Sequence, residues 1–389
     1  MVLVAGTGMT AFSRRKDGSG FRDWAGQAFQ AALASAGLER RDIDALVVAS
    51  ESDFFSLQLN PASVLADDFG LAGVACQRVE GGGASGQLAV HAATALVRGG
   101  LAKRVAVVGF EASASYLDAA DVSMLYGFSF DAWTDGMTGV SATALYALSA
   151  KMFMARSGAG VDDFARVSVQ NRKNACGNPD AHLPLDISVE DVAASPMISD
   201  PYRRLDCSPL SDGAAAIILT APGAAPADRQ GAARITGIGA ASDRARLGDR
   251  NDPGQFCGKR AAAKRAYAMA GIDRPAEQIG LAEVYDAFAG AQLQAIEALG
   301  LSADLLGEHR AGGFAPGGRL PVNLSGGLLG QGAPVGATGI AQLIACARQV
   351  EGTYHDALQM PSPPALAVAD THGGVATTCA VTVLAGAGA

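Results

Sequence analysis

The sequence is poor in charged and in aromatic side chains. Only 17% of its 389 residues are Asp, Glu, Lys or Arg, only 6% are Phe, Trp or Tyr, and the formal net charge is -8. Nucleic-acid binding depends on clustered Lys and Arg, so this composition argues against a nucleic-acid partner. The 49% of hydrophobic residues and the 49 glycines indicate a compact protein with a large core and closely packed helices.

Long apolar runs and paired metal ligands are also missing. No apolar run reaches the roughly 18 residues that a membrane-spanning helix requires, and near the start the charges follow the apolar stretch. We therefore expect a cytoplasmic protein without a membrane span. No CxxC pair and no His at zinc-ligand spacing accompany the six cysteines, so no metal site is predicted. Buried free thiols are expected at Cys76, Cys176, Cys207, Cys257, Cys346 and Cys379.

A complete dinucleotide-binding fingerprint is absent as well. The segments "GTGMTAF" near the start and "GIGAAS" at 237–242 each carry part of the GxGxxG pattern. Neither continues into a helix with an acidic residue about twenty positions later. A nucleotide cofactor bound in the Rossmann manner is therefore not expected.

What the chain does contain is an alternation of short apolar runs and helical stretches. The runs "VLVAGTG", "DALVVAS", "RVAVVGF" and "GAAAIIL" are rich in Val, Ile and Ala, and stretches such as "FRDWAGQAFQAALASAG" separate them. Nearly continuous apolar strands are typical of sheets that are covered on both faces, so the sequence predicts an α/β layer fold.

The same order begins again after an Ala/Pro/Gly-rich joint at 221–233. It runs through strand "RITGIGA", helix "GKRAAAKRAYAMAG", strand "IGLAEVY", helix "GATGIAQLIACARQV" and strands "PALAVAD" and "CAVTVLAG". We therefore predict an internal duplication, with halves at 1–225 and 230–389. The match is clearest where "GASG" at 83–86 and "GATG" at 336–339 each open a helix of small residues.

A long insertion at about 117–205 separates the last two strands of the first half. It contains helical periodicity in "ATALYALSAKMFMARSG" and "VDDFARVSVQNRKNA", followed by a stretch broken by prolines. Ordered insertions of this length tend to cover functional sites, so we expect a cap.

Three consecutive glycines, Gly81 to Gly83, precede the first small-residue helix. A helix start surrounded by glycine exposes unpaired backbone N–H groups beside the positive end of the helix dipole, which suits an oxyanion or a developing enolate. Glycine also permits a close approach of the ligand. The alternative is a tight strand-to-helix turn between crowded layers, and this segment alone does not separate the two.

Several blocks in order resemble the thiolase superfamily, in particular its sterol-carrier-type branch. "VEGGGASGQLAVHAA" is similar to the nucleophile segment, "CSPLSDGAAAIIL" to the end of the first half, and residues 168–206 to the cap. "EVYDAFAGAQLQAIEALGL" looks like the HDAF block, and "VNLSGGLLGQGAPVGATGIAQL" like the GHPxGATG block. The resemblance implies a five-layered α-β-α-β-α fold of two duplicated βαβαβαββ halves with a cap insertion, usually dimeric.

The resemblance does not extend to the catalytic residues of the family. Where the family has its nucleophilic Cys this chain has Gly83, and where it has His this chain has Ala333 and Tyr285. The family's late Cys, its acid and base, falls within 370–374, where this chain has no cysteine. Thiolysis needs a thiolate that carries the acyl group, so we predict that no acyl-enzyme forms.

Main-chain donors survive the loss of these side chains. Backbone N–H groups near Gly83 and near Gly373 and Gly374 are expected to form an oxyanion hole, with Ala333 in the substrate-binding region. The glycine at 83 is further expected to leave room for an acyl group bulkier than acetyl. A coenzyme A thioester is then the expected substrate, with no covalently bound cofactor.

Two side chains are candidates for catalysis. Tyr285 presents a phenol at the position from which the family's His reaches the thioester oxygen; it is a hydrogen-bond donor at its ordinary pKa and a base if that pKa is depressed, and the alternative is a packed core tyrosine. His372 follows strand "ALAVAD" and is the best remaining base, with a structural histidine as the alternative.

Structural or minor roles are expected for several other polar residues. Asp286 is expected to be structural, and Tyr126, Asp131 and Asp135 are weaker candidates for the pocket lining. Cys76 and Cys207 lie in strand or strand-entry segments and are not expected to replace the missing nucleophile. No role is assigned to the remaining histidines, which are His91, His182, His309 and His355.

The sequence is compatible with three functions. The resemblance includes cysteine-free members that act as retro-aldolases on the CoA-ester side chains of steroids, beside a small zinc-ribbon and OB-fold protein. That reading fits the retained oxyanion hole, and it implies a homodimer with such a partner. The alternatives are an acyltransferase of the acetyl-CoA acetyltransferase or thiolase type, and a noncatalytic subunit that binds acyl-CoA or lipid.

Overall fold

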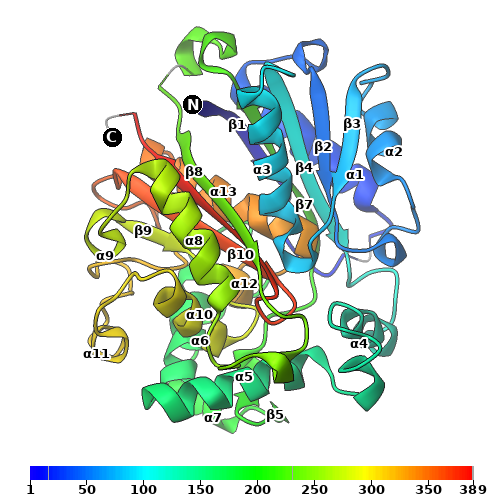
Figure 1. Ribbon diagram of the computed structural model, residues 1–389. Helices are drawn as coiled ribbons and strands as arrows, with labels where there is room; N and C mark the ends of the chain where they lie inside the picture. The colour runs from blue at the N-terminus through cyan, green and yellow to red at the C-terminus, as the bar shows by residue number, and fades with distance from the viewer. Residues whose placement is uncertain (16, 230, 388–389) are drawn as a thin grey trace.

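The structure is a computed structural model that describes residues 1–15, 17–229 and 231–387 (Figure 1). Residue 230, where the second half was expected to begin, lies outside the described residues. No helix in the described part of the chain has the length and apolar character needed to cross a bilayer.

The first half follows the predicted alternation of strands and helices. Each predicted apolar run forms a strand and each predicted helical stretch forms a helix. The elements are β1 (Val2–Met9), α1 (Phe21–Ala36), β2 (Ala45–Ala49), α2 (Pro61–Asp68), β3 (Ala75–Val79), α3 (Ser85–Arg98), β4 (Arg104–Ala112) and β7 (Asp212–Thr220).

The second half contains the counterparts. These are β8 (Arg234–Ser242), α8 (Cys257–Ala270), α9 (Pro275–Gln278), β9 (Leu281–Glu283), α10 (Ala289–Ala298), α11 (Leu305–Arg310), α12 (Gly327–Gly330), α13 (Val335–Glu351), β10 (Leu366–Gly373) and β11 (Thr378–Ala385).

Strand order shows the same topology twice. The nine strands run β3-β2-β4-β7-β1-β8-β11-β10-β9, so each half repeats one order outward from its first strand. The counterpart of β3 in the second half is reduced to a single bridge between Ala282 and Val322. A duplicated layer fold is expected to have one separate sheet in each half. Here β1 pairs with β8 at Val2 and Leu3, and this short contact joins all nine strands into one sheet.

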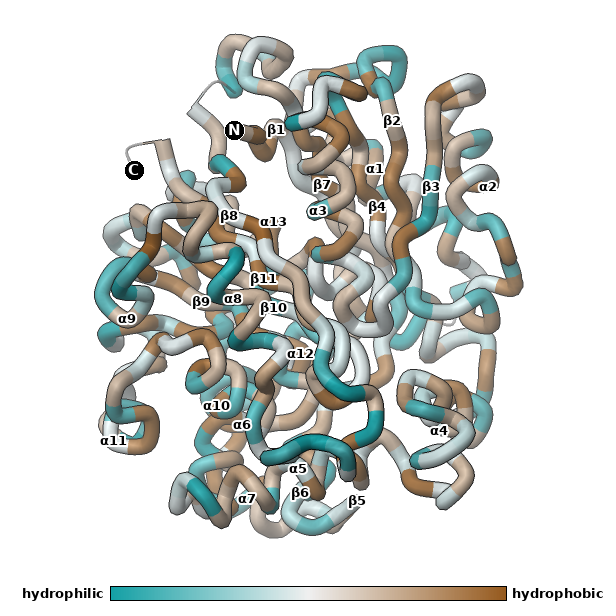
Figure 2. The backbone as a smooth tube through the Cα atoms, viewed as in Figure 1, coloured by the Kyte–Doolittle hydropathy of each residue, from teal (hydrophilic) through white to brown (hydrophobic). Residues whose placement is uncertain are grey.

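The layers alternate as predicted. Along β2 and β4, Leu46 and Ala106 pack in a cluster with α1, whereas Val47 and Val107 pack in a cluster with α3 and α13. This alternation follows the two-residue period of a strand, and it places helices on both faces of the sheet. Helices α3 and α13 contact strands of both halves, and α8 covers β8 and β11 on the outside. Figure 2 shows β2 largely hydrophobic along its length and α9 at the periphery largely hydrophilic.

Small residues let the two central helices touch. A Cβ atom at Gly86 would lie 3.0 Å from the carbonyl oxygen of Gly336, and one at Gly339 would lie 2.8 Å from the backbone nitrogen of Gln87. Contacts this short leave no space for a side chain. Glycine is therefore required at these two helix starts because the backbones of the two halves pack directly against each other. The sequence correctly predicted two small-residue rods.

The cap lies at one end of the molecule, beyond the ends of the strands (Figure 1). Its helices α5 and α6 coincide with the two periodic stretches of the sequence. The elements are α4 (Ala119–Gly127), α5 (Ala142–Ser157), α6 (Val161–Ala175), α7 (Val189–Ala194), β5 (Met197–Ser199) and β6 (Tyr202–Arg203).

His91 on α3 ties the two halves together and gives a test of the packing. Its Nε2 atom lies 2.9 Å from the hydroxyl of Thr382 on β11, and burial lowers the pKa of His91 from 6.5 to about 4. The unfolded chain therefore takes up a proton first as the pH falls from 6.5 toward 4, which removes folded-state stability in that window.

Between pH 7 and pH 4, we expect the free energy of unfolding of the wild type to fall by up to about 3 kcal/mol more than that of His91→Gln. Urea unfolding of both proteins at several pH values measures this shift. A difference that stays constant with pH would show that His91 is not held neutral.

Candidate active site

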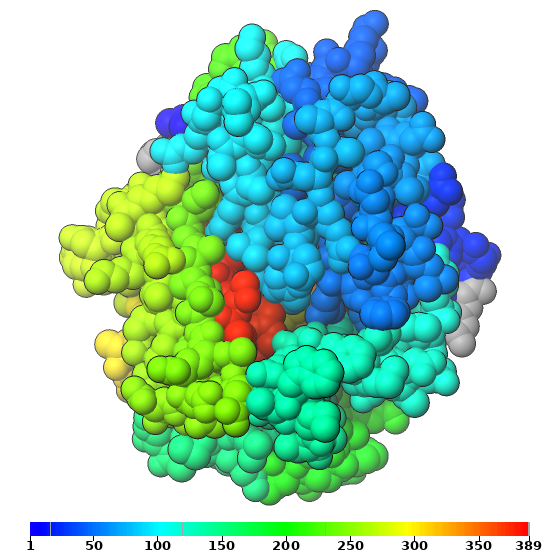
Figure 3. All heavy atoms as spheres, turned by 45° about the vertical axis from the view of Figure 1, so that its right-hand side comes forward, coloured from blue at the N-terminus to red at the C-terminus, as the bar shows by residue number. Residues whose placement is uncertain are grey.

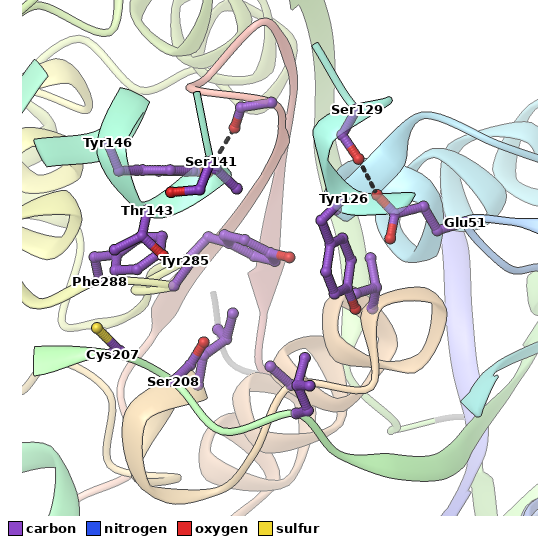
Figure 4. A pocket seen from close by; sticks show the side chains of 18 of the residues that line it. Glu51, Tyr126, Ser129, Ser141, Thr143, Tyr146, Cys207, Ser208, Tyr285 and Phe288 are labelled. Carbon is purple, nitrogen blue, oxygen red and sulfur yellow. Dashed lines mark hydrogen bonds between the residues drawn. The ribbon is translucent and has the colours of Figure 1, made fainter. Parts of the chain in front are cut away.

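A cavity of about 300 Å³ opens between the two halves and the cap. Five of the six predicted site residues line it: Gly83, Tyr285, Ala333, His372 and Gly374. Gly373 lines an adjoining cavity instead. The cap contributes side chains from α4, from the segment after it and from α5, as expected of a covering insertion; Figure 4 shows Tyr126, Ser129, Ser141, Thr143 and Tyr146 from this part of the chain.

The glycine turn brings the start of α3 to the cavity. After β3, a 3₁₀ turn at Gly82–Ala84 leads into α3, and Gly82 adopts a φ of 60°, a left-handed conformation that favours glycine. Ser85 holds the turn, because its hydroxyl accepts from the Gly81 N–H at 3.0 Å and donates to the Gly82 carbonyl at 2.7 Å.

Two main-chain donors at this turn and opposite it remain free. In the described part of the chain, no acceptor is found for the N–H of Gly83 or for that of Gly374, which has a φ of 58° at the end of β10. Both residues line the cavity. Unpaired backbone N–H groups beside a cavity are the chemical requirement for binding an oxyanion.

Tyr285 fills the space beside Gly83. An added Cβ at Gly83 would lie 2.7 Å from Cζ of Tyr285, and closer still to the phenol oxygen and to the carbonyl oxygen of His372. The expectation that Gly83 leaves room for a larger acyl group is therefore wrong, because the aromatic ring already occupies that volume. Residues 83 and 285 are complementary: a side chain at 83 and the ring of Tyr285 exclude each other.

The Tyr285 phenol keeps its proton. Burial first, and then the nearby carboxyl group of Glu51, raise the pKa of Tyr285 above its ordinary value. Among the described residues no group forms a hydrogen bond with the hydroxyl, which points into the open space of the cavity in Figure 4. Of the two roles considered from the sequence, this environment favours the hydrogen-bond donor over the base.

His372 is engaged through both ring nitrogens. Lys259 on α8 lies 3.0 Å from Nδ1, and the hydroxyl of Tyr146 lies 2.8 Å from Nε2. An ammonium group only donates, so Nδ1 accepts, Nε2 carries the proton and donates to Tyr146, and the Tyr146 hydroxyl donates to the Gly374 carbonyl at 2.5 Å.

Burial and the charge of Lys259 lower the pKa of His372 well below its usual value. The expected base role therefore does not fit the structure: the imidazole stays neutral with no free lone pair. It acts instead on the backbone near Gly374 through Tyr146. Sequence reasoning missed Lys259, which is fully buried in an ion pair with Asp370.

Among the described residues on the cavity wall, one is a cysteine, and it is a thiol rather than a thiolate. Cys207 lines the cavity and forms an isolated β-bridge with Phe288. Burial, followed by the charge of Asp206, raises its pKa to about 12. A thiol of that pKa has almost no thiolate at neutral pH and is a poor nucleophile. Cys76 lies on the exposed strand β3 and Cys176 and Cys257 are also exposed, against the expectation that all six thiols are buried.

Glu51 is a site residue that sequence reasoning missed. It follows β2 by two residues and lines the cavity; burial raises the pKa of its carboxyl group to about 7. Its Oε1 accepts from the hydroxyl of Ser129 at 2.8 Å, and its Oε2 has no partner among the described residues (Figure 4). The available signal was an acidic residue just past a buried parallel strand, at the sheet edge where ligands bind in such folds.

The weaker candidates for the pocket lining differ in whether they reach the cavity. Tyr126 lines the cavity, whereas Asp131 and Asp135 do not. Asp286 is structural as predicted, since it accepts from the N–H of Leu328 at 2.7 Å and from the amide of Asn171 at 2.7 Å. Of the histidines without an assigned role, His182 contacts the Ser211 hydroxyl at 2.8 Å and His309 contacts the Asp163 carbonyl at 2.9 Å.

A second cavity adjoins the first and opens to the surface. It is lined by the Gly81–Gly82 turn, by Phe54 and Phe55, and by Gly373 and Thr377. Figure 3 shows this C-terminal segment at the floor of a depression between the N-terminal half, the second half and the cap. Within the described ranges, no group of three or more His, Cys, Asp or Glu side chains is arranged to hold a metal ion.

Comparisons with known proteins place the chain in a family. The family model described as "Thiolase, N-terminal domain" matches residues 2–222, and "Thiolase C-terminal domain-like" matches residues 239–386. The acetyl-CoA acetyltransferase of Methanothermobacter thermautotrophicus is 36% identical over 90% of this chain and 91% of its own length. Sterol carrier protein 2 of Bos taurus is 28% identical over 88% of this chain and 65% of its own length.

A solved structure gives a close geometric match. The "Ltp2-ChsH2(DUF35) aldolase" superimposes with a TM-score of 0.84 at 27% identity, covering 99% of this chain and 98% of that chain. The two family models together span nearly all of the described residues, in the order of the two halves. The chain belongs to the thiolase superfamily.

Proposed function

We propose that this chain cleaves the bond between the α- and β-carbons of a β-hydroxyacyl-CoA by a retro-aldol reaction, without an acyl-enzyme. The observation that carries the proposal is the exclusion at residue 83: the ring of Tyr285 occupies the place beside Gly83 where a nucleophilic side chain would stand. The thiol on the cavity wall, Cys207, is held protonated by burial. The site lacks the means for acyl transfer to sulfur but keeps the donors for an enolate.

The proposed reaction balances without a further reactant. A base takes the proton of the β-hydroxyl group, the β-carbon becomes a carbonyl carbon, and the bond to the α-carbon breaks. The electron pair moves into the thioester as an enolate, which then takes a proton at the α-carbon. The products are a ketone or aldehyde and a shortened acyl-CoA.

Each retained group has a part in this scheme. The free N–H groups of Gly83 and Gly374 stabilise the enolate oxygen, and each such donor contributes about 3 to 4 kcal/mol in known oxyanion holes. The Tyr285 hydroxyl donates to the oxygen on which charge develops. The cavity wall, which is mainly apolar overall, receives the acyl group, for which we propose a steroid or other bulky side chain.

Removal of the phenol oxygen tests the proposal. We expect Tyr285→Phe to lower kcat for cleavage of β-hydroxyacyl-CoA by about 10² to 10³, with little change in KM, because one transition-state donor is lost. The assay follows release of the ketone or aldehyde from a panel of CoA thioesters. Tyr267→Phe is the matched control, since the Tyr267 hydroxyl bonds to the Leu299 carbonyl and does not line the cavity. A wild-type protein that leaves every β-hydroxyacyl-CoA intact would refute the proposal.

The second candidate is an acyltransferase of the acetyl-CoA acetyltransferase type. It is favoured by the 36% identity to the Methanothermobacter thermautotrophicus protein of that name. Release of CoA from a 3-oxoacyl-CoA, with a covalent acyl adduct on a cysteine detected by mass spectrometry, would establish it in place of the aldolase. Tight thioester binding without turnover of either substrate class would instead point to a noncatalytic acyl-CoA or lipid-binding subunit.

We also propose that the protein acts as a homodimer beside a small zinc-ribbon and OB-fold protein. The name of the structurally similar aldolase joins two components, which supports a second chain. Light scattering of the purified protein, alone and with such a protein encoded nearby, measures both associations.

A further inference from the structure

The retro-aldol scheme needs one more component: a group that takes the β-hydroxyl proton. Tyr285 is held protonated by burial, and His372 has both ring nitrogens in hydrogen bonds. Cys207 is a half-buried thiol with a raised pKa of about 12. Glu51 is the carboxylic acid among the described residues that line the cavity, and its Oε2 is buried and has no partner among those residues.

We propose that Glu51 is the general base of the reaction, taking the proton of the β-hydroxyl group on Oε2 and returning it to the α-carbon of the enolate. The inference rests on the proposed retro-aldol function. The two transfers use the same proton, so the cycle ends with Glu51 again as a carboxylate and needs no other acid.

The position of Glu51 fits this role. The carboxyl group lies beside the glycine turn, since a Cβ at Gly82 would be 3.7 Å from its Oε1. The residue lines both cavities, together with Ser129 and Gly374, and so stands where they meet. In the proposed complex, a thioester held by the Gly83 and Gly374 donors has its α- and β-carbons next to this junction.

The carboxyl group is oriented before substrate arrives. The Ser129 hydroxyl donates to Oε1 at 2.8 Å, and the Glu51 backbone N–H donates to Oε2 of Glu111 at 2.7 Å. One oxygen is thus anchored from the cap and the main chain is anchored from β4, which leaves the second oxygen free. A base held in this way needs little reorganisation at the moment of proton transfer.

Its surroundings also set its charge state. The ionisable groups that face it are Glu80 after β3, Glu111 on β4, Tyr126 on α4 and Tyr285, while Arg78 on β3 is bound to the Ser50 carbonyl and to Asp53. Burial first, and then the charge of Glu80, raise the Glu51 pKa to about 7. A base with a pKa near the working pH combines a large ionised fraction with proton affinity.

The test compares Glu51→Gln with the wild type in the full-length protein. We expect kcat for cleavage to fall by about 10² to 10³ while KM for the thioester changes little. In the wild type, kcat/KM should fall as the pH drops below about 7, because protonation of Glu51 removes the base, and Glu51→Gln should lack this acid limb. Asp53→Asn is the matched control, because it removes a carboxylate from the same loop without touching either cavity.

A second variant guards against a purely structural effect. Glu51→Ala should regain part of its activity when formate is added, because a small carboxylate enters the vacated space, and a misfolded site would not respond. A wild type that does not cleave β-hydroxyacyl-CoA contradicts the proposed function itself. A wild type that cleaves it, with Glu51→Gln equally active and an unchanged acid limb, contradicts only the role of Glu51.

Discussion

Replacement of Lys259 by Met is expected to lower the free energy of unfolding by about 3 to 5 kcal/mol, because it leaves a buried charge without its partner. Lys259 and Asp370 form an ion pair in which neither side chain is exposed, and the ammonium also donates to His372 at 3.0 Å. Burial raises the pKa of Asp370 while Lys259 opposes that rise, so the carboxylate depends on this cation. Urea unfolding at pH 7 measures the loss.

Two further variants separate the lost pair from the lost side chain. Lys264→Met on the same helix changes an exposed lysine and is expected to alter stability by less than about 0.5 kcal/mol. The double variant Lys259→Met/Asp370→Asn should recover part of the loss, since it removes the unpaired charge as well. Equal stabilities of Lys259→Met and Lys264→Met would show that the buried pair does not hold this part of the core.

A methyl group at residue 83 is expected to lower kcat for the proposed cleavage by about 10⁴. The added Cβ meets the carbonyl oxygen of His372, which is backbone, as well as the ring of Tyr285. Relief requires the glycine turn and the ring to move apart, which displaces both the Gly83 N–H and the phenol, and a displacement of about 1 Å costs on the order of 10² in rate at each catalytic group. Overpacking of this kind also costs about 1 to 3 kcal/mol of stability.

The matched control for Gly83→Ala is Gly26→Ala. Gly26 lies within α1 and a Cβ there meets no atom within 4 Å, so the change should be neutral or stabilising. The same collision makes a direct prediction for Gly83→Cys: a cysteine introduced at residue 83 should not form an acyl-enzyme while Tyr285 is present. Detection by mass spectrometry of a stable acyl adduct on residue 83 of this variant would contradict the steric argument.

The sequence predicted those features that depend on the main chain or on the periodicity of apolar residues. Strand runs such as β4 and β7, and the helices that follow "GASG" and "GATG", were predictable because buried strands and small-residue helices leave a local signature. Family blocks then led to five of the cavity residues. The joining of the halves through β1 and β8 was not predictable, because it involves only two residues of each strand.

Chemical roles were harder to predict than positions. His372 was correctly located near the site, but its function depends on Lys259, more than a hundred residues away in sequence, and on Tyr146 from the cap. Glu51 was overlooked because a single acidic residue after a strand is common, and its raised pKa arises from burial by distant segments. Both cases show electrostatic properties that belong to an environment and not to a residue.

By itself the sequence determined the alternation of layers, the glycine turn at the start of α3 and the absence of cysteine at residue 83, since each of these is a property of residue type and local spacing. Only the tertiary structure decided that Tyr285 takes the space beside Gly83, that His372 is neutral and that Glu51 lines the cavity with one carboxylate oxygen unpaired. The reason is physical: packing volume, proton affinity and hydrogen-bond saturation are set by atoms that the fold brings together from remote parts of the chain.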